Sequence, residues 1–193
     1  MACRAKDPFK DLWALPGGFV GIEESLEECA NRKLTEKTGA QNVYLEQLYS
    51  FGAINRDPRE RVISVAYFSL VPFEKLTFEK QAATEKTQWY AIHQLPTLAF
   101  DHRQIIRAAH HRLVAKLEYS TVGLSLLPDA FTLSHVQDMY EIVSGKARDK
   151  RNFRKWLLGL NVIEETGGMQ SDGAHRPAKL YRRKNPNETS LFR

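Results

Sequence analysis

The chain has 193 residues, with 42% hydrophobic and 26% charged side chains, the composition of an ordinary globular protein exposed to water. This length allows one large domain or two small ones. The apolar runs fall short of the ~20 residues that a membrane-spanning helix needs, and the N-terminus does not resemble a signal peptide. Cys3 and Cys29 are the only cysteines and form no CxxC pair, which predicts neither a disulfide framework nor a zinc site. We therefore expect a cytoplasmic protein without a membrane partner.

The positive charge is confined to the second half of the chain. Residues 1–109 carry 14 basic and 14 acidic side chains, so the net charge of +5 comes from residues 110–193. Residues 144–184 alone carry 11 Lys and Arg against 4 Asp and Glu. This asymmetry favours a neutral first domain and a second domain that faces a polyanion. A solvated basic surface without a partner is the alternative.

The first half alternates helical and strand patterns. Residues 25–39 predict a helix, since Ser25 and Glu28 form a capping box and Gly39 fits a C-terminal cap. Alternating apolar and polar residues predict strands, and helical spacing predicts a linking helix further on. These segments are strands over 42–52, 61–71 and 87–92, and a helix over 101–120.

The second half predicts a helix–turn–helix followed by a hairpin. Gly123 and Pro128 interrupt the linking helix, so a domain boundary is expected there. Thr132 and Gly145 mark the N-cap and the stop of a short amphipathic helix. A second helix over 151–161 and two strands within 162–184 complete the order of a winged helix.

The loop and helix near the N-terminus resemble the Nudix box, G-x5-E-x7-R-E-U-x-E-E-x-G-U, where U is a bulky aliphatic residue. Two of its glutamates are replaced by Lys33 and Lys37, and Ala40 is small for the final aliphatic. The box positions that match are Gly18, Glu24, Arg32, Leu34, Glu36 and Gly39.

The resemblance implies a Nudix fold whose metal site is lost. In Nudix hydrolases three glutamates at the positions of Lys33, Glu36 and Lys37 hold a divalent metal against a diphosphate. Hard cations need oxygen ligands, and an ammonium group has no lone pair and repels a cation. We therefore expect no metal and no catalytic residue, with Glu24 and Arg32 kept as a structural ion pair. The two lysines either neutralise a bound diphosphate, or are ordinary solvated helix residues.

A second segment, FGAINRDPRERVISVAYFSL, resembles the G-x-x-x-R-D-P-R turn of Nudix proteins that handle ADP-ribose. Arg56 and Arg59 can bind phosphate or ribose oxygens, and Asp57 can accept hydrogen bonds from sugar hydroxyls. A charged hairpin turn with internal Arg–Asp pairs is the alternative. The expected ligand-binding residues are Lys33, Glu36, Lys37, Arg56, Asp57 and Arg59.

From residue 131 onward the chain resembles the C-terminal domain of Nudix-related transcriptional regulators. Basic and amide side chains cluster where the second helix begins, and the N-terminal end of a recognition helix reads bases in the major groove. Arg176 and Lys179 lie on the expected wing, which suits backbone or minor-groove contact. The expected DNA-binding residues are Lys150, Arg151, Asn152, Arg154, Lys155, Arg176 and Lys179.

The expected fold is α+β, a Nudix-type α/β/α sandwich followed by a winged helix-turn-helix. Only seven residues precede Pro8, so the N-terminal strand region of the Nudix fold is expected to be missing. The expected parts are a ligand-sensing domain, a linking helix and linker, a DNA-binding domain and a tail. They span residues 1–100, 101–125, 126–185 and 186–193.

The resemblance implies a DNA-binding transcriptional regulator, a homodimeric repressor of NAD-metabolism genes. Its effector would be an ADP-ribose-like nucleotide, its partner a double-stranded operator, and it would need no cofactor. Three alternatives stay open. They are a pentose-responsive regulator of the same family, an active Nudix diphosphatase on ADP-ribose-like substrates, and a protein-interaction scaffold.

Overall fold

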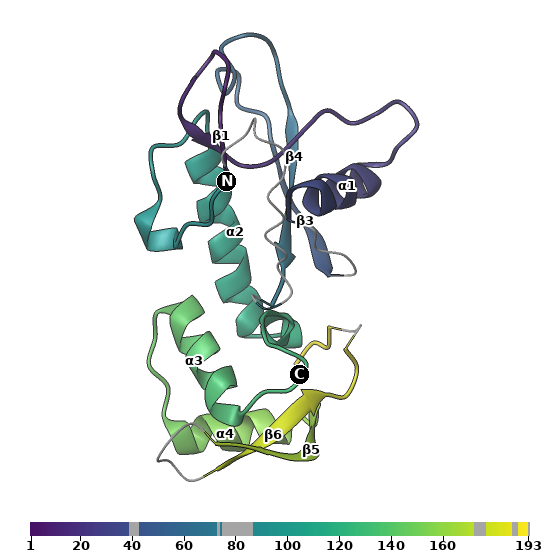
Figure 1. The fold of residues 1–193 in the computed structure, drawn as a ribbon, viewed down its shortest axis with the longest axis vertical. Coiled ribbons are helices and arrows are strands. Elements are labelled where there is room, and N and C mark those ends of the chain that lie inside the picture. The colour runs from purple at the N-terminus through teal and green to yellow at the C-terminus, as the bar shows by residue number, and fades with distance from the viewer. Residues whose placement is uncertain (39–42, 73, 75–86, 172–176, 187–188, 193) are drawn as a thin grey trace. The chain divides into compact units, whose positions relative to one another are not determined.

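The computed structural model describes residues 1–38, 43–72, 74, 87–171, 177–186 and 189–192 (Figure 1). Two compact units divide the chain: unit 1 is formed by residues 1–69 and 76–109, and unit 2 by residues 70–75 and 110–193, as far as these are described. The division falls inside the helix that follows Asp101. Throughout the described ranges, the helices are too short or too polar to cross a bilayer.

The described part of unit 1 combines short strands with one α-helix that lies wholly inside it. Among the described residues, β1 (Ala2–Cys3) pairs antiparallel with β2 (Trp13–Ala14), and β3 (Tyr44–Phe51) pairs with β4 (Ser64–Leu70). Helix α1 (Leu26–Thr38) begins at the predicted capping box, where Glu28 N donates to Ser25 Oγ at 3.2 Å and Ser25 N donates to Glu28 Oε2 at 2.7 Å. The reciprocal bonds satisfy two donors that the first helical turn leaves free.

The prediction of a strand over 87–92 is wrong. Thr87 forms a single bridge with Ala2, and the chain then turns into the 3-10 helix η2 (Ile92–Gln94). Tyr90 packs its ring edge-on against Trp13 with centroids 5.1 Å apart. Side-chain packing against Trp13 therefore replaces the strand ladder that the β-branched and aromatic residues predict.

Helix α2 (His102–Leu117) is the predicted linking helix and runs from unit 1 into unit 2. It ends in the buried 3-10 helix η3 (Thr121–Leu126), which Ser120 caps by accepting a hydrogen bond from Val122 N at 3.4 Å. A side chain at Gly123 would overlap Leu117. Glycine therefore stands there to allow close packing.

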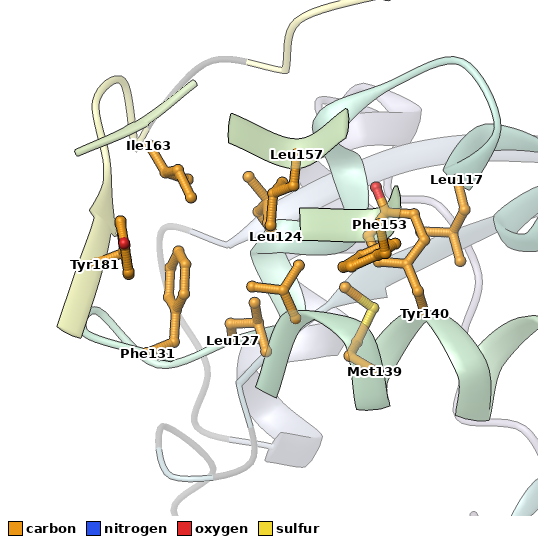
Figure 2. Packing of buried hydrophobic residues seen from close by; sticks show 11 residues of the cluster. Leu117, Leu124, Leu127, Phe131, Met139, Tyr140, Phe153, Leu157, Ile163 and Tyr181 are labelled. Atoms are coloured by element: carbon orange, nitrogen blue, oxygen red, sulfur yellow. The ribbon is translucent and has the colours of Figure 1, made fainter. Parts of the chain in front are cut away.

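Unit 2 has the predicted winged-helix order. Helices α3 (Leu133–Ser144) and α4 (Lys150–Gly159) are followed by the antiparallel pair of β5 (Ile163–Gln170) and β6 (Ala178–Arg183). Thr132 caps α3 by accepting from His135 N, and Gly145 ends it with φ 68°. Figure 2 shows the core side chains that the helices and the hairpin share. These are Leu117, Leu124, Leu127, Phe131, Val136, Met139, Tyr140, Phe153, Leu157, Ile163 and Tyr181.

The C-terminal segment, predicted as a tail, packs against other parts of unit 2. Thr121 N donates to Ser190 O at 2.9 Å, and Phe192 N donates to Tyr119 O at 2.7 Å. The Phe192 ring meets Trp156 of α4 edge-on, with centroids 5.4 Å apart. Residues 190–192 thus join the segment after α2 to the face of α4 that Trp156 occupies.

Candidate functional site

The Nudix-like loop is closed over the start of α1 by an ion pair, as the sequence predicts. Arg32 Nε donates to Glu24 Oε2 at 2.9 Å, a second guanidinium nitrogen contacts the same carboxylate, and Gly21 N donates to Glu24 Oε1 at 2.7 Å. The bonds from Arg32, followed by the bond from Gly21, lower the pKa of Glu24 to about 2. Glu24 is therefore an ionised structural acceptor.

The carboxylate of Glu36 lies between two cations. Lys33 Nζ donates to Glu36 Oε2 at 2.7 Å, and Arg32 Nη1 donates to Glu36 Oε1 at 3.2 Å. These bonds lower the pKa of Glu36, with the Lys33 contribution the larger. The Gly18 backbone lies against the flexible end of the Lys33 side chain, which a side chain at position 18 would push aside. Lys37 is in the last turn of α1.

These residues do not fit a hard divalent cation. Lys33 occupies a position where Nudix hydrolases carry a metal-binding glutamate, and the two glutamates that remain, Glu24 and Glu36, are already bound by cationic side chains. A magnesium site needs oxygen ligands free to coordinate. Within the described residues, no three His, Cys, Asp or Glu side chains gather into a metal-binding group.

Arg56 of the predicted ligand turn is buried, 9% exposed, and forms internal contacts. Its Nε and Nη2 donate to the two carboxylate oxygens of Asp101 at 2.8 and 2.7 Å, and its Nη1 donates to Ser64 Oγ at 2.7 Å. The bidentate pair ties the turn to the residue just before α2. This contact accounts for Arg56 structurally, and its contact with a ligand stays a prediction.

Asp57 is also buried, whereas Arg59 is half exposed. Asp57 accepts from Arg59 N and Nε at 3.0 Å each and from Arg59 Nη2 at 2.7 Å, and these bonds lower the pKa of Asp57 to about 2 despite its burial. The Arg59 side chain is 50% exposed and lies 5.8 Å from the centroid of the Phe100 ring. Of the turn residues predicted to bind a ligand, Arg59 is the one that solvent reaches.

The predicted ligand-binding residues fall into two separate groups according to their contacts. Lys33 and Glu36 pair on α1, while Arg56 and Asp57 pair with Asp101 and Arg59 around the turn. The sequence does not predict the pair of Arg56 with Asp101, because Asp101 is distant along the chain and only folding brings the two side chains together.

The predicted DNA-binding side chains at the start of α4 are mostly solvent-exposed. Asp149 caps the helix by accepting from Asn152 N at 2.8 Å. Lys150, Arg151, Asn152 and Lys155 are exposed, while Phe153 and Leu157 on the opposite face are buried in the core. These basic side chains of α4 therefore lie on its solvent-exposed face, as the amphipathic spacing predicts.

Arg154 differs from its neighbours because it leans against α3. Its Nη2 donates to Ser134 Oγ at 3.1 Å, and its buried Nε has no hydrogen-bond partner among the described atoms. Base contact by this residue stays a prediction, and its guanidinium also links α4 to the start of α3.

The wing carries cross-strand ion pairs. Lys179 Nζ donates to both carboxylate oxygens of Glu165 at 2.8 and 3.0 Å, and Arg182 Nε donates to Glu164 at 2.7 Å. Both pairs are exposed, so they contribute little to stability and can open toward a phosphate. Arg176 lies outside the described residues.

Arg148, in the segment between α3 and α4, has contacts that no pattern in the sequence predicts. The guanidinium of Arg148 donates to Glu118 Oε1 at 3.0 Å and lies over the rings of Tyr140 and Phe153. A single arginine before a helix carries no distinctive spacing, so only the tertiary structure reveals these contacts.

Two family models match this arrangement. The model described as NUDIX domain matches residues 1–109, and the model described as NrtR DNA-binding winged helix domain matches residues 123–183. The chain is 42% identical over 183 residues to the "ADPR responsive transcriptional repressor NtrR" of Acinetobacter baylyi, covering 93% of this chain and 72% of that protein. It is 36% identical over 104 residues to the "ADP-ribose pyrophosphatase" of Methanocaldococcus jannaschii, covering 54% of this chain and 60% of that protein.

Solved structures resemble both units. Shewanella oneidensis NrtR complexed with a 27mer DNA matches with a TM-score of 0.84 and 35% identity, over 95% of this chain and 84% of that chain. The NUDIX domain of the same protein complexed with ADP ribose matches with a TM-score of 0.50 and 39% identity, over 58% and 75%. The fold and site thus define a Nudix domain joined to a winged-helix DNA-binding domain. The chain belongs to the NrtR family of Nudix-related transcriptional regulators.

Proposed function

We propose that this chain is a DNA-binding transcriptional repressor whose Nudix unit binds an ADP-ribose-like nucleotide as effector without hydrolysing it. One observation carries the proposal. The chain joins a Nudix unit to a winged helix whose second helix begins with exposed basic side chains. In the Nudix unit, Glu36 is the one glutamate left at the three metal-binding positions, and Arg32 and Lys33 both bind it. The named relatives, one responsive to ADPR and one complexed with DNA, support both halves.

The Nudix unit on this proposal needs no metal and is not an enzyme. Hydrolysis of a diphosphate at such a site uses a metal ion to activate water, and the ammonium group of Lys33, which is bound to Glu36, repels a cation from that carboxylate. Purified protein with Mg²⁺ or Mn²⁺ and ADP-ribose should release no AMP above a control without protein. Turnover on the order of 1 s⁻¹, ordinary for enzymes, would instead favour the diphosphatase, the activity named for the archaeal relative.

The effector contacts on this proposal include the cations of α1 and the exposed guanidinium of Arg59. Calorimetry should detect ADP-ribose binding that weakens in Arg59→Ala, since a guanidinium is a strong phosphate and ribose donor. Because this variant also leaves the buried Asp57 carboxylate without its partner, thermal unfolding must show that it is folded at the temperature of the titration. Arg103→Ala is the matched control, because Arg103 in unit 1 is exposed and its described hydrogen bond is to Pro96 O. Equal affinity for ADP-ribose in wild type and both variants would show that Arg59 does not contact the effector. Binding of arabinose or xylose in place of ADP-ribose would favour a pentose-responsive regulator.

The winged helix on this proposal places α4 in the major groove of a palindromic operator and its hairpin against the backbone. Arg151→Ala should cost roughly 1–3 kcal/mol and relax preference at one operator position. Lys179→Ala should weaken binding to all sequences alike and lower the salt slope by about one. A homodimer should protect two half-sites about one helical turn apart or a multiple of it. Equal binding of operator and random DNA by all proteins would leave the basic half as a charged surface.

The proposed targets are genes of NAD metabolism, because the level of an ADP-ribose-like effector depends on that metabolism. The proposed location is the cytoplasm, where a repressor binds chromosomal operators. Footprinting on DNA upstream of such genes tests this part, with and without ADP-ribose. Protection of a pentose-utilisation promoter and none of an NAD-metabolism promoter would reassign the regulon.

A further inference from the structure

Arg148 lies between the end of α2 and the start of α4. Its Nη2 donates to Glu118 Oε1 at 3.0 Å, and Glu118 directly follows the last residue of α2. Leu117 and Ser120, on either side of this segment, are buried with 1% and 0% of their surface exposed. The backbone that carries Glu118 is therefore fixed in the core, and an ion pair with Glu118 fixes Arg148 to it.

The guanidinium of Arg148 also lies over two core rings. It lies 5.3 Å from the centroid of Tyr140, on α3, and 5.9 Å from the centroid of Phe153, on α4. Arg148 is 24% exposed, so these cation–π contacts are partly shielded from water and stronger for it. A planar guanidinium fits between rings in a way that the ammonium group of lysine does not.

The backbone of Arg148 is held by α3. Arg148 N donates to Glu141 Oε1 at 2.8 Å, and Gln137 Nε2 donates to Arg148 O at 2.9 Å. The next residue, Asp149, is the N-cap of α4. An open surface pocket of about 320 Å³ at this junction is lined by Leu117, Glu118, Arg148, Asp149, Asn152, Phe153 and Trp156. The polar contacts of Arg148 at the wall of this pocket join the end of α2 and helix α3 to the N-cap of α4.

We propose that Arg148 is a positioning residue for DNA recognition, which holds the start of α4 in register with the end of α2 through Glu118. The inference rests on the proposed function, since α4 must read DNA for its register to matter. The side chain acts on base reading through the helix it holds, and it does not itself contact phosphate.

The test uses the full chain and a duplex enriched from a random pool by the wild type, with a random duplex of equal length as the non-specific probe. Arg148→Met should lower affinity for the selected duplex about ten-fold or more, with affinity for random DNA and the salt slope unchanged. Arg148→Lys keeps the charge but not the planar fit between rings, so most of the loss should remain. A uniform loss with a salt slope lower by about one, rescued by lysine, would make Arg148 a phosphate contact and overturn the proposal.

The variant Glu118→Gln distinguishes a positioning role of Arg148 from a phosphate contact, because the two roles predict opposite changes in DNA affinity. Positioning predicts a lower ratio of selected to random affinity, because Arg148 loses its anchor. A phosphate contact predicts tighter binding to both duplexes, because a competing carboxylate is gone. Asp138→Asn is the matched control, since it removes an exposed carboxylate from α3 in the same unit, outside the residues proposed to bind DNA. A Glu118→Gln variant that behaves like this control would overturn the proposal.

The failures are separable. If selection by the wild type enriches no duplex, the proposed function falls and this inference with it. If the wild type binds the selected duplex more tightly than random DNA, and both Arg148→Met and Glu118→Gln keep the same ratio of affinities, only the positioning role of Arg148 is refuted. Should Arg148→Met fail to fold by circular dichroism, Glu118→Gln decides alone, since Glu118 is 57% exposed and its loss leaves the core intact.

Discussion

Replacing Arg56 by methionine should destabilise unit 1 strongly. The side chains of Arg56 and Asp101 are only 6% and 10% exposed, and two hydrogen bonds of 2.8 and 2.7 Å join them. Methionine fills part of the space but leaves the Asp101 carboxylate buried without its cation. Breaking one partner of a buried pair costs about 3–5 kcal/mol. For a unit of this size that corresponds to a fall in Tm of about 12 °C or more.

Scanning calorimetry on the full chain measures this, with the transition of unit 2 assigned by its response to Leu157→Ala and the remaining transition assigned to unit 1. The double variant Arg56→Met/Asp101→Leu removes both charges and should regain most of the stability, since apolar pairs often replace buried ion pairs without loss. A Tm for Arg56→Met within about 2 °C of the wild type would refute the reasoning. The same result bears on effector binding, because a destabilised Arg56 variant cannot report a lost ligand contact.

Two further predictions concern pH and the core. The pKa of Asp57 in the folded state is about 2, below its ordinary value of 3.8, so its stabilising effect is complete above about pH 5 and is lost as the pH falls toward 2. The free energies of unfolding of wild type and Asp57→Asn, measured with urea, should therefore converge between pH 4 and pH 2. A constant difference between them would contradict this. Leu157→Ala should cost about 2–5 kcal/mol, whereas Leu158→Ala, 47% exposed, should change stability by less than about 0.5 kcal/mol, both measured by thermal unfolding of unit 2.

The helix ends were predictable because their signals are local. Ser25 with Glu28, Thr132 and Gly145 act within one helical turn, so a few neighbouring residues specify the cap. The strand predicted at 87–92 failed for the opposite reason. Its aromatic residues suit a sheet, but Tyr90 packs on Trp13, far away along the chain, and contacts of that kind override propensity.

The candidate sites divide in the same way. The resemblance to the Nudix box places Lys33 where a metal-binding glutamate would be. Spacing along one helix, which fixes which side chains share a face, predicts that basic residues open a second amphipathic helix. The partners of Arg56 and Arg148 do not follow from spacing, whereas the pair of Asp57 with Arg59 is the internal Arg–Asp pair that the sequence offered as an alternative.

The sequence by itself determined the order of a Nudix-like unit and a winged helix, the loss of metal-binding glutamates and the basic start of α4. Only the tertiary structure decided that Arg56 is bound by Asp101, that Arg59 stays open to solvent, and that Arg148 meets Glu118. The physical reason is that a cap or a helix face is set by residues within about four positions of each other. An ion pair between residues 45 or 30 positions apart exists only once the chain has folded and brought both ends together.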